Sequence, residues 1–266
     1  MDNQAYKIES DGTQRTHFGF QYVDKTEKGQ LVRDLFNAVA PQYDLMNDIM
    51  SGGIHRLWKE AVLDWLLPRP GMSLLDVAGG TGDITFRFID RITKKLSING
   101  KIDKPVTICD VSTEMVAVGR DRALDRGIIG DLFWICGNAE DLPFDDCKFD
   151  AVTFVFGLRN VTYPERALRE CRRVLKPGGH FICLEFSHVF LPLLDRLYSA
   201  YSFGVVPWLG EVVAGNRDAY QYLVESIKRF PPQDKLAWLM SQANFSQVRV
   251  RNLSGGIAAI HSGWRI

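Results

Sequence analysis

A glycine-rich turn is the segment of this sequence best suited to bind a ligand. Residues 74–83 read LLDVAGGTGD, an apolar strand followed by small residues at positions 78, 80 and 82. Small residues let the backbone bend sharply and come close to a ligand, where a larger side chain would intrude. A helix that begins near Asp83 would direct its free N–H groups at the same turn, and such a helix end favours a carboxylate or a phosphate. The segment therefore predicts a turn that binds a nucleotide-like cofactor.

The spacing of the glycines separates two classes of cofactor. A dinucleotide-binding turn needs a third glycine three residues after the second, but Thr85 stands three residues after Gly82. An NAD-dependent oxidoreductase is therefore disfavoured, although calorimetry with NAD remains its test. An adenosyl cofactor such as S-adenosylmethionine fits the turn better.

Polar residues at the ends of the following strands agree with an adenosyl cofactor. Asp110 ends the strand PVTICD, where an acid can accept hydrogen bonds from both ribose hydroxyls. The alternative is a helix cap, formed by Asp110 or Ser112. Asn138 follows the next strand, where its amide could contact the adenine edge or only serve a turn. We favour the cofactor role for Asp110.

The composition is that of an ordinary globular protein and excludes some partners. The 32 basic residues are matched by 32 acidic ones, so no net charge favours nucleic acid, and a small-molecule substrate is expected. The five cysteines show no C-x-x-C pair and are interpreted as reduced, buried thiols of an intracellular protein. The five histidines lack metal-ligand spacing, so no metal is expected.

The pattern of apolar residues predicts an α/β fold. Apolar strands alternate with helical segments from Ser73 onward, which indicates a mostly parallel sheet flanked by helices. The expected strands are SLLDVA, PVTICD, DLFWICG, FDAVTFVF and HFICLEF. Residues 248–253 and 257–260, joined by a glycine turn, predict an antiparallel hairpin at the edge of the sheet. Lys176-Pro177-Gly178-Gly179 is interpreted as the stop of the last helix before strand HFICLEF.

The two ends of the chain are expected to differ in order. Residues 1–26 are polar and aperiodic and predict a mobile tail that docks through His17-Phe18-Gly19-Phe20. Helical spacing over 31–39 and 58–67 predicts a helical lid within 27–70. No apolar run reaches the roughly 18 to 20 residues that span a bilayer, and the first residues do not form a secretion signal.

Several motifs together resemble the ubiquinone and menaquinone biosynthesis C-methyltransferases, and the likeness covers nearly the whole chain. Beyond the glycine turn it includes YDxMNDxMSxGxHRxWK at 43–59, FGLRNVT at 156–162, LKPGG at 175–179, LEFS at 184–187 and YLxESI at 222–227. The resemblance implies the class I methyltransferase fold, which is Rossmann-like with a seven-stranded sheet and here an N-terminal lid. It further implies S-adenosylmethionine as cofactor and C-methylation of a polyprenyl methoxy-benzoquinol, or alternatively of another lipophilic phenol such as demethylmenaquinol.

The resemblance also implies a set of cofactor contacts. These are Ala78, Gly80, Thr81, Gly82, Asp110, Val111, Asn138, Ala139 and Val155. Two positions depart from the family pattern, because Val155 replaces a frequent serine and Asn216 replaces a usual aspartate. These departures leave open a second hypothesis, in which the chain binds cofactor but serves as a scaffold subunit of a quinone-synthesis complex.

Candidate catalytic and substrate residues lie in the loop after the fourth strand and in the lid. Methylation at carbon needs an electron-rich ring, so the site should stabilise a phenolate. Arg159 is expected to polarise a ring hydroxyl or order a water, and Asn160 is expected to orient the ring. Tyr43 is expected to act with them from the lid, with His55 and Arg56 beside the substrate. A surface ion pair for Arg159 and packing within the lid for His55 are the alternatives.

The segment 186–232 is expected to form a substrate-side insertion. Its apolar part over 186–208, with Tyr201 among its aromatic residues, could wall a groove for the prenyl tail, rest on a membrane surface or only cover the core. The amino-acid sequence of segments 209–215 and 224–231 resembles that of the mitochondrial ubiquinone members of this family. This resemblance implies that the protein is located at the matrix face of the inner membrane. Other quinone-biosynthesis proteins and a second copy of the chain are the remaining expected partners.

Overall fold

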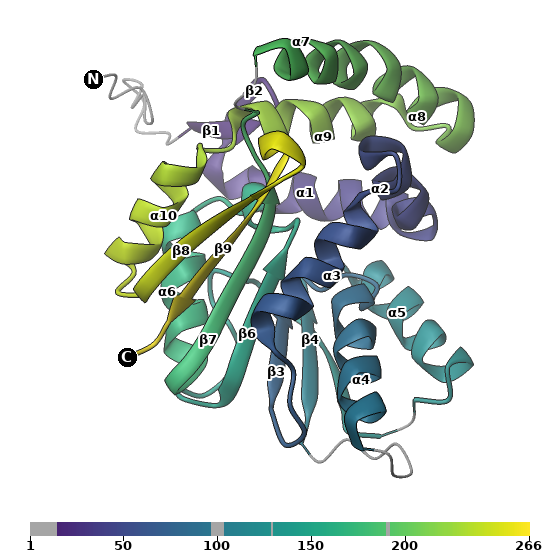
Figure 1. Cartoon of the computed structure of the whole chain (residues 1–266). Helices are drawn as coiled ribbons and strands as arrows, with labels where there is room; N and C mark the ends of the chain where they lie inside the picture. Colours follow the sequence, from purple (N-terminus) through teal and green to yellow (C-terminus); the bar gives the residue numbers. More distant parts are fainter. Residues whose placement is uncertain (1–14, 97–103, 129, 190–191) are drawn as a thin grey trace.

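The computed structural model describes residues 15–96, 104–128, 130–189 and 192–266. Its centre is a seven-stranded sheet in the order β5-β4-β3-β6-β7-β9-β8 (Figure 1). The strands are β3 (Leu74–Val77), β4 (Val106–Asp110), β5 (Leu132–Cys136), β6 (Phe149–Val155), β7 (Leu175–Phe186), β8 (Ser246–Leu253) and β9 (Ala258–Trp264). The first five pair in parallel, whereas β9 is antiparallel to both β7 and β8. The expected α/β fold with an antiparallel C-terminal hairpin is confirmed.

Helices cover both faces of the sheet and the edge where the parallel strands end. The α-helices are α1 (Lys25–Val39), α2 (Tyr43–Ser51), α3 (His55–Leu66), α4 (Asp83–Leu96), α5 (Thr113–Asp125), α6 (Pro164–Val174), α7 (Pro192–Ala200), α8 (Val206–Ala214), α9 (Arg217–Arg229) and α10 (Gln233–Gln242). Short helices of other types are η1 (Ala40–Gln42), η2 (Leu158–Asn160), the π-helix η3 (Tyr201–Val205) and η4 (Ser254–Gly256). In Figure 1, α1, α2 and α7 to α9 lie above the upper edge of the sheet.

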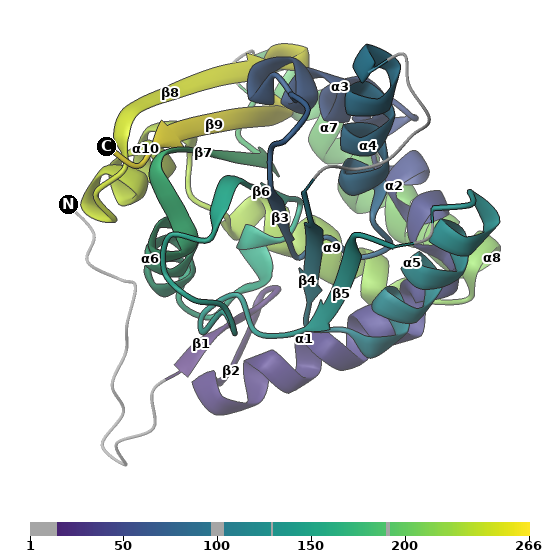
Figure 2. The ribbon, with the colours of Figure 1, turned by 90° about the horizontal axis from the view of Figure 1, so that it is seen from below.

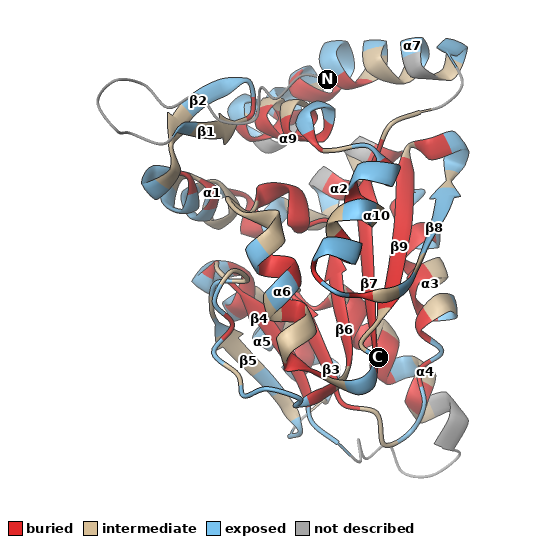
Figure 3. Ribbon diagram, turned by 90° about the vertical axis from the view of Figure 1, so that its left-hand side faces the viewer, coloured by how far each residue is buried: buried red, intermediate tan, exposed pale blue. Residues whose placement is uncertain are grey.

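Two apolar clusters form the core, one on each face of the sheet. Strands β3, β4 and β6 are buried almost throughout because they carry apolar runs and have helices on both sides (Figure 3). On one face, Trp58 and Leu63 of α3 pack with Phe88 of α4. On the other face, Leu168 of α6 packs with Met240 of α10. Figure 2 shows these two helical layers on either side of the strands.

The N-terminal segment contains a hairpin that the sequence pattern did not reveal. Strands β1 (Arg15–Phe18) and β2 (Gln21–Asp24) pair antiparallel around Gly19. The Phe18 ring stacks on Tyr222 of α9 at 4.2 Å between centroids, so the aromatic end of the segment packs on the helical cap. Residues 1–14 of the expected tail lie outside the described residues. The division into a tail and a methyltransferase domain stays a prediction.

Strand β7 begins earlier than the sequence pattern indicated. The Pro177-Gly178-Gly179 segment, interpreted as a helix stop, lies within β7, because α6 has already ended at Val174. The pairing with β6 jumps from Phe149↔Leu175 to Ala151↔His180, which is a bulge in the sheet. Gly178 has a φ of 77°, a conformation that most other residues avoid, so the Pro-Gly-Gly sequence shapes this bulge.

Candidate functional site

A cavity of about 280 Å³ opens between the ends of the parallel strands and helix α1. The ends of β3, β4 and β6 supply one wall, and α1 supplies the other. The lining includes Ala78, Gly80, Asp110, Val111, Asn138, Ala139, Tyr43 and Asn160 among the residues singled out from the sequence. Residues from five separate segments of the sequence therefore meet at one cavity.

The glycine turn adopts a conformation that exposes its backbone to this cavity. Ala78, Gly80 and Gly82 have φ angles of 50°, 55° and 83°, in the left-handed region. A second segment approaches closely, since a Cβ on Gly157 would come 2.5 Å from the Cβ of Ala78. The loop after β6 therefore packs against the turn only because residue 157 has no side chain.

Asp110 lies in the cavity wall and fixes the local backbone. Its Oδ2 accepts from the Gly80 N–H at 2.8 Å, and its Oδ1 accepts from the Ser112 N–H at 2.9 Å. Burial raises the pKa of Asp110, while these backbone donors act against the rise. Ser112, not Asp110, caps α5 by accepting from the Met115 N–H. Each carboxylate oxygen keeps a second lone pair, so the group can still accept from a ligand hydroxyl.

Three residues expected to contact the cofactor lie outside the cavity lining. Val155 packs in the apolar core, and a Cβ on Gly82 would come 2.8 Å from the Trp134 ring. Thr81 is buried, and its hydroxyl accepts from Arg122 of α5 at 3.0 Å. Direct cofactor contacts by these three residues stay predictions.

Arg159 is not among the residues that line the cavity and forms a buried ion pair that the sequence did not reveal. Its Nη1 lies 3.0 Å from Oε2 of Glu185, and the two side chains are 3% and 1% exposed. The same Nη1 donates to the Phe156 carbonyl at 2.5 Å, and Oε1 of Glu185 accepts from the Arg159 N–H. This ion pair connects η2 with β7, and the opposite charges of its two side chains nearly cancel. The alternative of a surface ion pair is wrong, because both partners are buried, and the expected role of Arg159 at a ring hydroxyl or a water stays a prediction.

Asn160 and Tyr43 are the candidate catalytic residues that do line the cavity. Asn160 follows Arg159 in η2, and its Oδ1 accepts from the Tyr222 hydroxyl at 3.1 Å. Burial raises the pKa of Tyr43 to about 12, with the Arg159 guanidinium acting in the opposite direction. Tyr43 is therefore protonated at neutral pH and acts as a hydrogen-bond donor. Both residues offer polar groups to the cavity, whose wall also contains the aromatic rings of Phe36 and Phe156.

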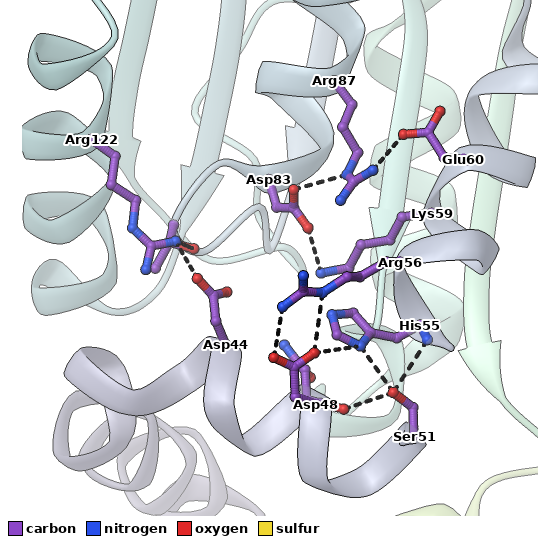
Figure 4. A network of polar contacts seen from close by, with 12 residues as sticks. Asp44, Asp48, Ser51, His55, Arg56, Lys59, Glu60, Asp83, Arg87 and Arg122 are labelled. Atoms are coloured by element: carbon purple, nitrogen blue, oxygen red, sulfur yellow. Dashed lines mark hydrogen bonds and ion pairs between the residues drawn. The ribbon is translucent and has the colours of Figure 1, made fainter. Parts of the chain in front are cut away.

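The three expected substrate residues lie in the lid or the cap and not on the cavity wall. His55 is buried, its Nδ1 lies 2.9 Å from the Ser51 hydroxyl, and burial lowers its pKa to about 4 (Figure 4). Arg56 forms two hydrogen bonds with Asp48 and is largely exposed. The Tyr201 hydroxyl donates to the Ile49 carbonyl and joins η3 to α2.

Figure 4 also shows how the lid is attached to the glycine turn. The Lys59 ammonium of α3 lies 2.8 Å from Oδ2 of Asp83, at the start of α4. Arg87 contacts the other oxygen of Asp83 at 2.9 Å. Arg122 of α5 donates to the Thr81 hydroxyl at 3.0 Å, and its Nη1 also lies 2.7 Å from Oδ2 of Asp44 in α2. Ion pairs thus connect both lid helices with residues at or next to the turn.

Helix α1 supplies cavity residues that the sequence analysis did not single out. They are Lys25, Thr26, Gly29, Val32, Arg33 and Phe36. Their spacing follows one face of a helix, which is the signal that could have identified them. Lys28 is buried on the same helix and donates to the Val161 carbonyl at 2.9 Å, so α1 is tied to the segment after η2.

Asn216 explains one of the two departures from the family pattern. Its side chain accepts from the Ala219 N–H at 3.1 Å and caps the start of α9. Asparagine and aspartate are about equally good in this role.

Within the described residues no group of His, Cys, Asp or Glu could hold a metal ion. In the same part of the chain, no helix has the length and apolar character needed to cross a bilayer.

The residues of the cavity fit S-adenosylmethionine. The Asp110 carboxylate suits ribose hydroxyls, the left-handed turn at Ala78 and Gly80 allows close backbone approach, and Asn138 offers an amide further along the wall. Methyl transfer would use the methyl group that this cofactor carries on sulfur. The chain's part is to bind that cofactor and to hold a nucleophile in line with the methyl group.

Comparison with known proteins agrees with this geometry. Residues 23–265 match the ubiE/COQ5 methyltransferase family. A protein of Brucella canis named ubiquinone/menaquinone biosynthesis C-methyltransferase UbiE is 49% identical over 262 residues, covering 98% of this chain and 94% of the relative. The protein of the same name from Brucella anthropi is 47% identical over 268 residues, covering 100% and 99%.

Solved structures share the fold at low sequence identity. A methyltransferase of Thermotoga maritima, described as S-adenosylmethionine-dependent, has a TM-score of 0.58 at 22% identity, covering 88% of this chain and all of that one. A putative methyltransferase in complex with the Haloferax volcanii activator Trm112 has a TM-score of 0.60 at 17% identity, covering 86% and 97%. With the family match over nearly its whole length, the chain belongs to the ubiE/COQ5 methyltransferase family.

Proposed function

We propose that this S-adenosylmethionine-dependent C-methyltransferase of ubiquinone and menaquinone biosynthesis acts on the ring of a polyprenyl methoxy-benzoquinol. The observation that carries the proposal is a single cavity that joins the cofactor-side residues Gly80 and Asp110 to Tyr43 and Asn160. A quinol ring placed at Tyr43 and Asn160 would lie beside the cofactor. The aromatic side chains of Phe36 and Phe156 in the same wall suit such a ring.

The site would promote the reaction by stabilising a phenolate. Transfer of a quinol hydroxyl proton to a water molecule would make the ring carbon electron-rich, and the negative charge would then rest on the ring oxygen. Tyr43 is protonated at neutral pH, since its pKa is about 12, and it can donate a hydrogen bond to that oxygen. Fixed donors in a site that excludes water stabilise such charge strongly. The Arg159–Glu185 pair would hold the loop that carries Asn160 and would not contact the ring itself.

The test is methyl transfer by the purified protein to a defined panel of substrates. Methyl-labelled S-adenosylmethionine is supplied with short-chain methoxy-benzoquinol, its O-methylated analogue or demethylmenaquinol, all under reducing conditions. The proposal predicts label on a ring carbon of the methoxy-benzoquinol and a strong loss in Tyr43→Phe, with the exposed Tyr22→Phe as control. Preference for demethylmenaquinol, or transfer to oxygen, would contradict the assigned substrate.

We further propose that the cap formed by α7, η3 and α8 rests on a lipid surface. Leu193, Leu197, Trp208 and Val212 are 72%, 62%, 55% and 64% exposed on these helices, which form the outer layer at the top of Figure 1. Exposed apolar side chains gathered on adjacent helices suit the apolar boundary of a bilayer, where a prenylated substrate resides. The cap also packs on α9, whose Tyr222 contacts Asn160.

Vesicle binding tests the lipid contact. Wild-type protein should sediment with phosphatidylcholine vesicles. Leu197→Ser with Trp208→Ser should abolish sedimentation, whereas Leu124→Ser should not, since Leu124 is equally exposed on α5. Equal binding of the two variants would contradict the assignment.

The cellular setting is proposed from the sequence resemblance. The segments 209–215 and 224–231 support the matrix face of the mitochondrial inner membrane and a complex with other quinone-biosynthesis proteins. Fractionation of the source cells and native mass measurement of the purified complex would test both points. A protein found away from the inner membrane, or one that remains a monomer there, would contradict them.

A further inference from the structure

The amide of Asn160 has one end fixed inside the protein and the other left for a ligand. Its Oδ1 accepts from the Tyr222 hydroxyl at 3.1 Å, which is the one side-chain hydrogen bond that the described residues give it. Asn160 lines the cavity while being only 7% exposed. The Nδ2 group, with its two N–H donors, is therefore the end that remains for a molecule in the cavity.

Tyr222 is itself firmly placed. It is buried on α9, and the Phe18 ring of the N-terminal hairpin stacks on it. The hairpin is held to the same helix by a hydrogen bond of 2.8 Å from the Phe20 N–H to Glu225. Burial raises the pKa of Tyr222 well above its ordinary value, so the hydroxyl keeps its proton and can donate.

We propose that Tyr222 is a positioning residue that orients Asn160 so that its amide donates to the ring oxygen of the quinol. The inference rests on the proposed function, because it requires the ring to lie at Asn160. A phenolate oxygen needs a donor, and an amide turned the other way would face it with a carbonyl oxygen and repel it. In the reversed orientation the amide would turn its N–H groups towards the Tyr222 hydroxyl, and these groups cannot accept the hydroxyl proton. The hydrogen bond from Tyr222 to Oδ1 therefore favours the observed orientation.

Arg159, the neighbour of Asn160 in η2, does not supply this donor. Its guanidinium is held by Glu185 and by the Phe156 carbonyl, and neither Arg159 nor Glu185 is among the residues that line the cavity. Tyr43 lines the cavity from the start of α2 and is a second donor. Tyr222 therefore acts through Asn160 and does not itself touch the substrate.

The experiment compares two tyrosine variants on α9 with the quinol assay. Tyr222→Phe removes the donor to Asn160, whereas Tyr220→Phe removes a buried hydroxyl that has no hydrogen-bond partner. We expect Tyr222→Phe to lower kcat about tenfold, the effect of one lost hydrogen bond, and to leave KM for S-adenosylmethionine within about twofold. Tyr220→Phe should keep wild-type kcat.

Two further variants show whether the effect passes through the amide. In an Asn160→Ala background, Tyr222→Phe should cause no further loss of kcat, because its target is gone. Asn160→Asp should be at least as inactive as Asn160→Ala, since a carboxylate cannot donate and would repel the phenolate. A multiplicative loss in the double variant, or an active Asn160→Asp protein, would overturn the inference. Absence of quinol methylation in the wild type would instead contradict the proposed function.

Discussion

The buried pair of Arg159 and Glu185 allows a quantitative prediction about stability. Arg159→Met leaves the Glu185 carboxylate, 1% exposed, with only backbone donors. Breaking a buried ion pair by removing one partner costs about 3 to 5 kcal/mol in the free energy of unfolding. Glu185→Gln leaves the guanidinium with the Phe156 carbonyl and should cost a similar amount. The double variant buries no charge and should lose only about 1 to 2 kcal/mol, because neutral replacement of such pairs is often tolerated.

The assay is urea unfolding followed by fluorescence for the wild type, both single variants and the double variant. Burial raises the pKa of Glu185, so the folded state binds more protons than the unfolded state and this contribution to stability is lost as pH rises. Without Arg159 the effect should grow, so Arg159→Met should regain stability relative to wild type as pH is lowered towards 5. Additive losses in the double variant, or no pH dependence of the difference, would refute the reasoning.

Three further predictions concern other charged groups. Asp110→Asn leaves the N–H group of either Gly80 or Ser112 without an acceptor. We expect it to weaken S-adenosylmethionine binding, measured by calorimetry, at least about tenfold. Asp121→Asn, a change at an exposed aspartate, should leave this binding unchanged. Burial acts to raise the pKa of Asp83, but Lys59 and Arg87 outweigh it and hold the pKa at about 2. Its contribution of about 2 kcal/mol should therefore be lost as pH falls from 4 to 2, and the stability of Asp83→Asn measured by urea should not show this loss. Burial lowers the pKa of Lys28 to about 8, so wild-type stability should rise between about pH 8 and 10 relative to Lys28→Met, and an unchanged difference would argue against a buried ammonium.

The sequence was most informative where apolar runs are long. Strands β4, β6 and β9 are buried almost throughout, and their apolar runs are visible without a structure. The same reasoning placed Asp110 and Asn138 at strand ends, where parallel strands bring them to one edge. The hairpin at 15–24 was missed because its strands are four residues each and mostly polar or half-buried.

Side-chain direction was the least predictable part of the site. The sequence located Arg159 in a loop beside the cavity but could not show that the guanidinium turns back towards Glu185. Glu185 was noted only within the LEFS motif, and nothing there indicated its partner, which is 26 residues away. Tyr222 was noted only within a motif, and its contact with Asn160 spans 62 residues. Pairings between distant segments depend on the packed fold, which local patterns do not contain.

We propose that the cavity between Asp110 and Asn160 holds a quinol ring carbon in line with the methyl group of S-adenosylmethionine. The most direct measurement is carbon NMR of the product formed from ¹³C-methyl-labelled cofactor and reduced methoxy-benzoquinol. We expect a new methyl group on a ring carbon with the wild-type protein and a strong reduction of this product with Asn160→Ala. Label on oxygen, or no transfer by folded protein that binds the cofactor, would contradict it.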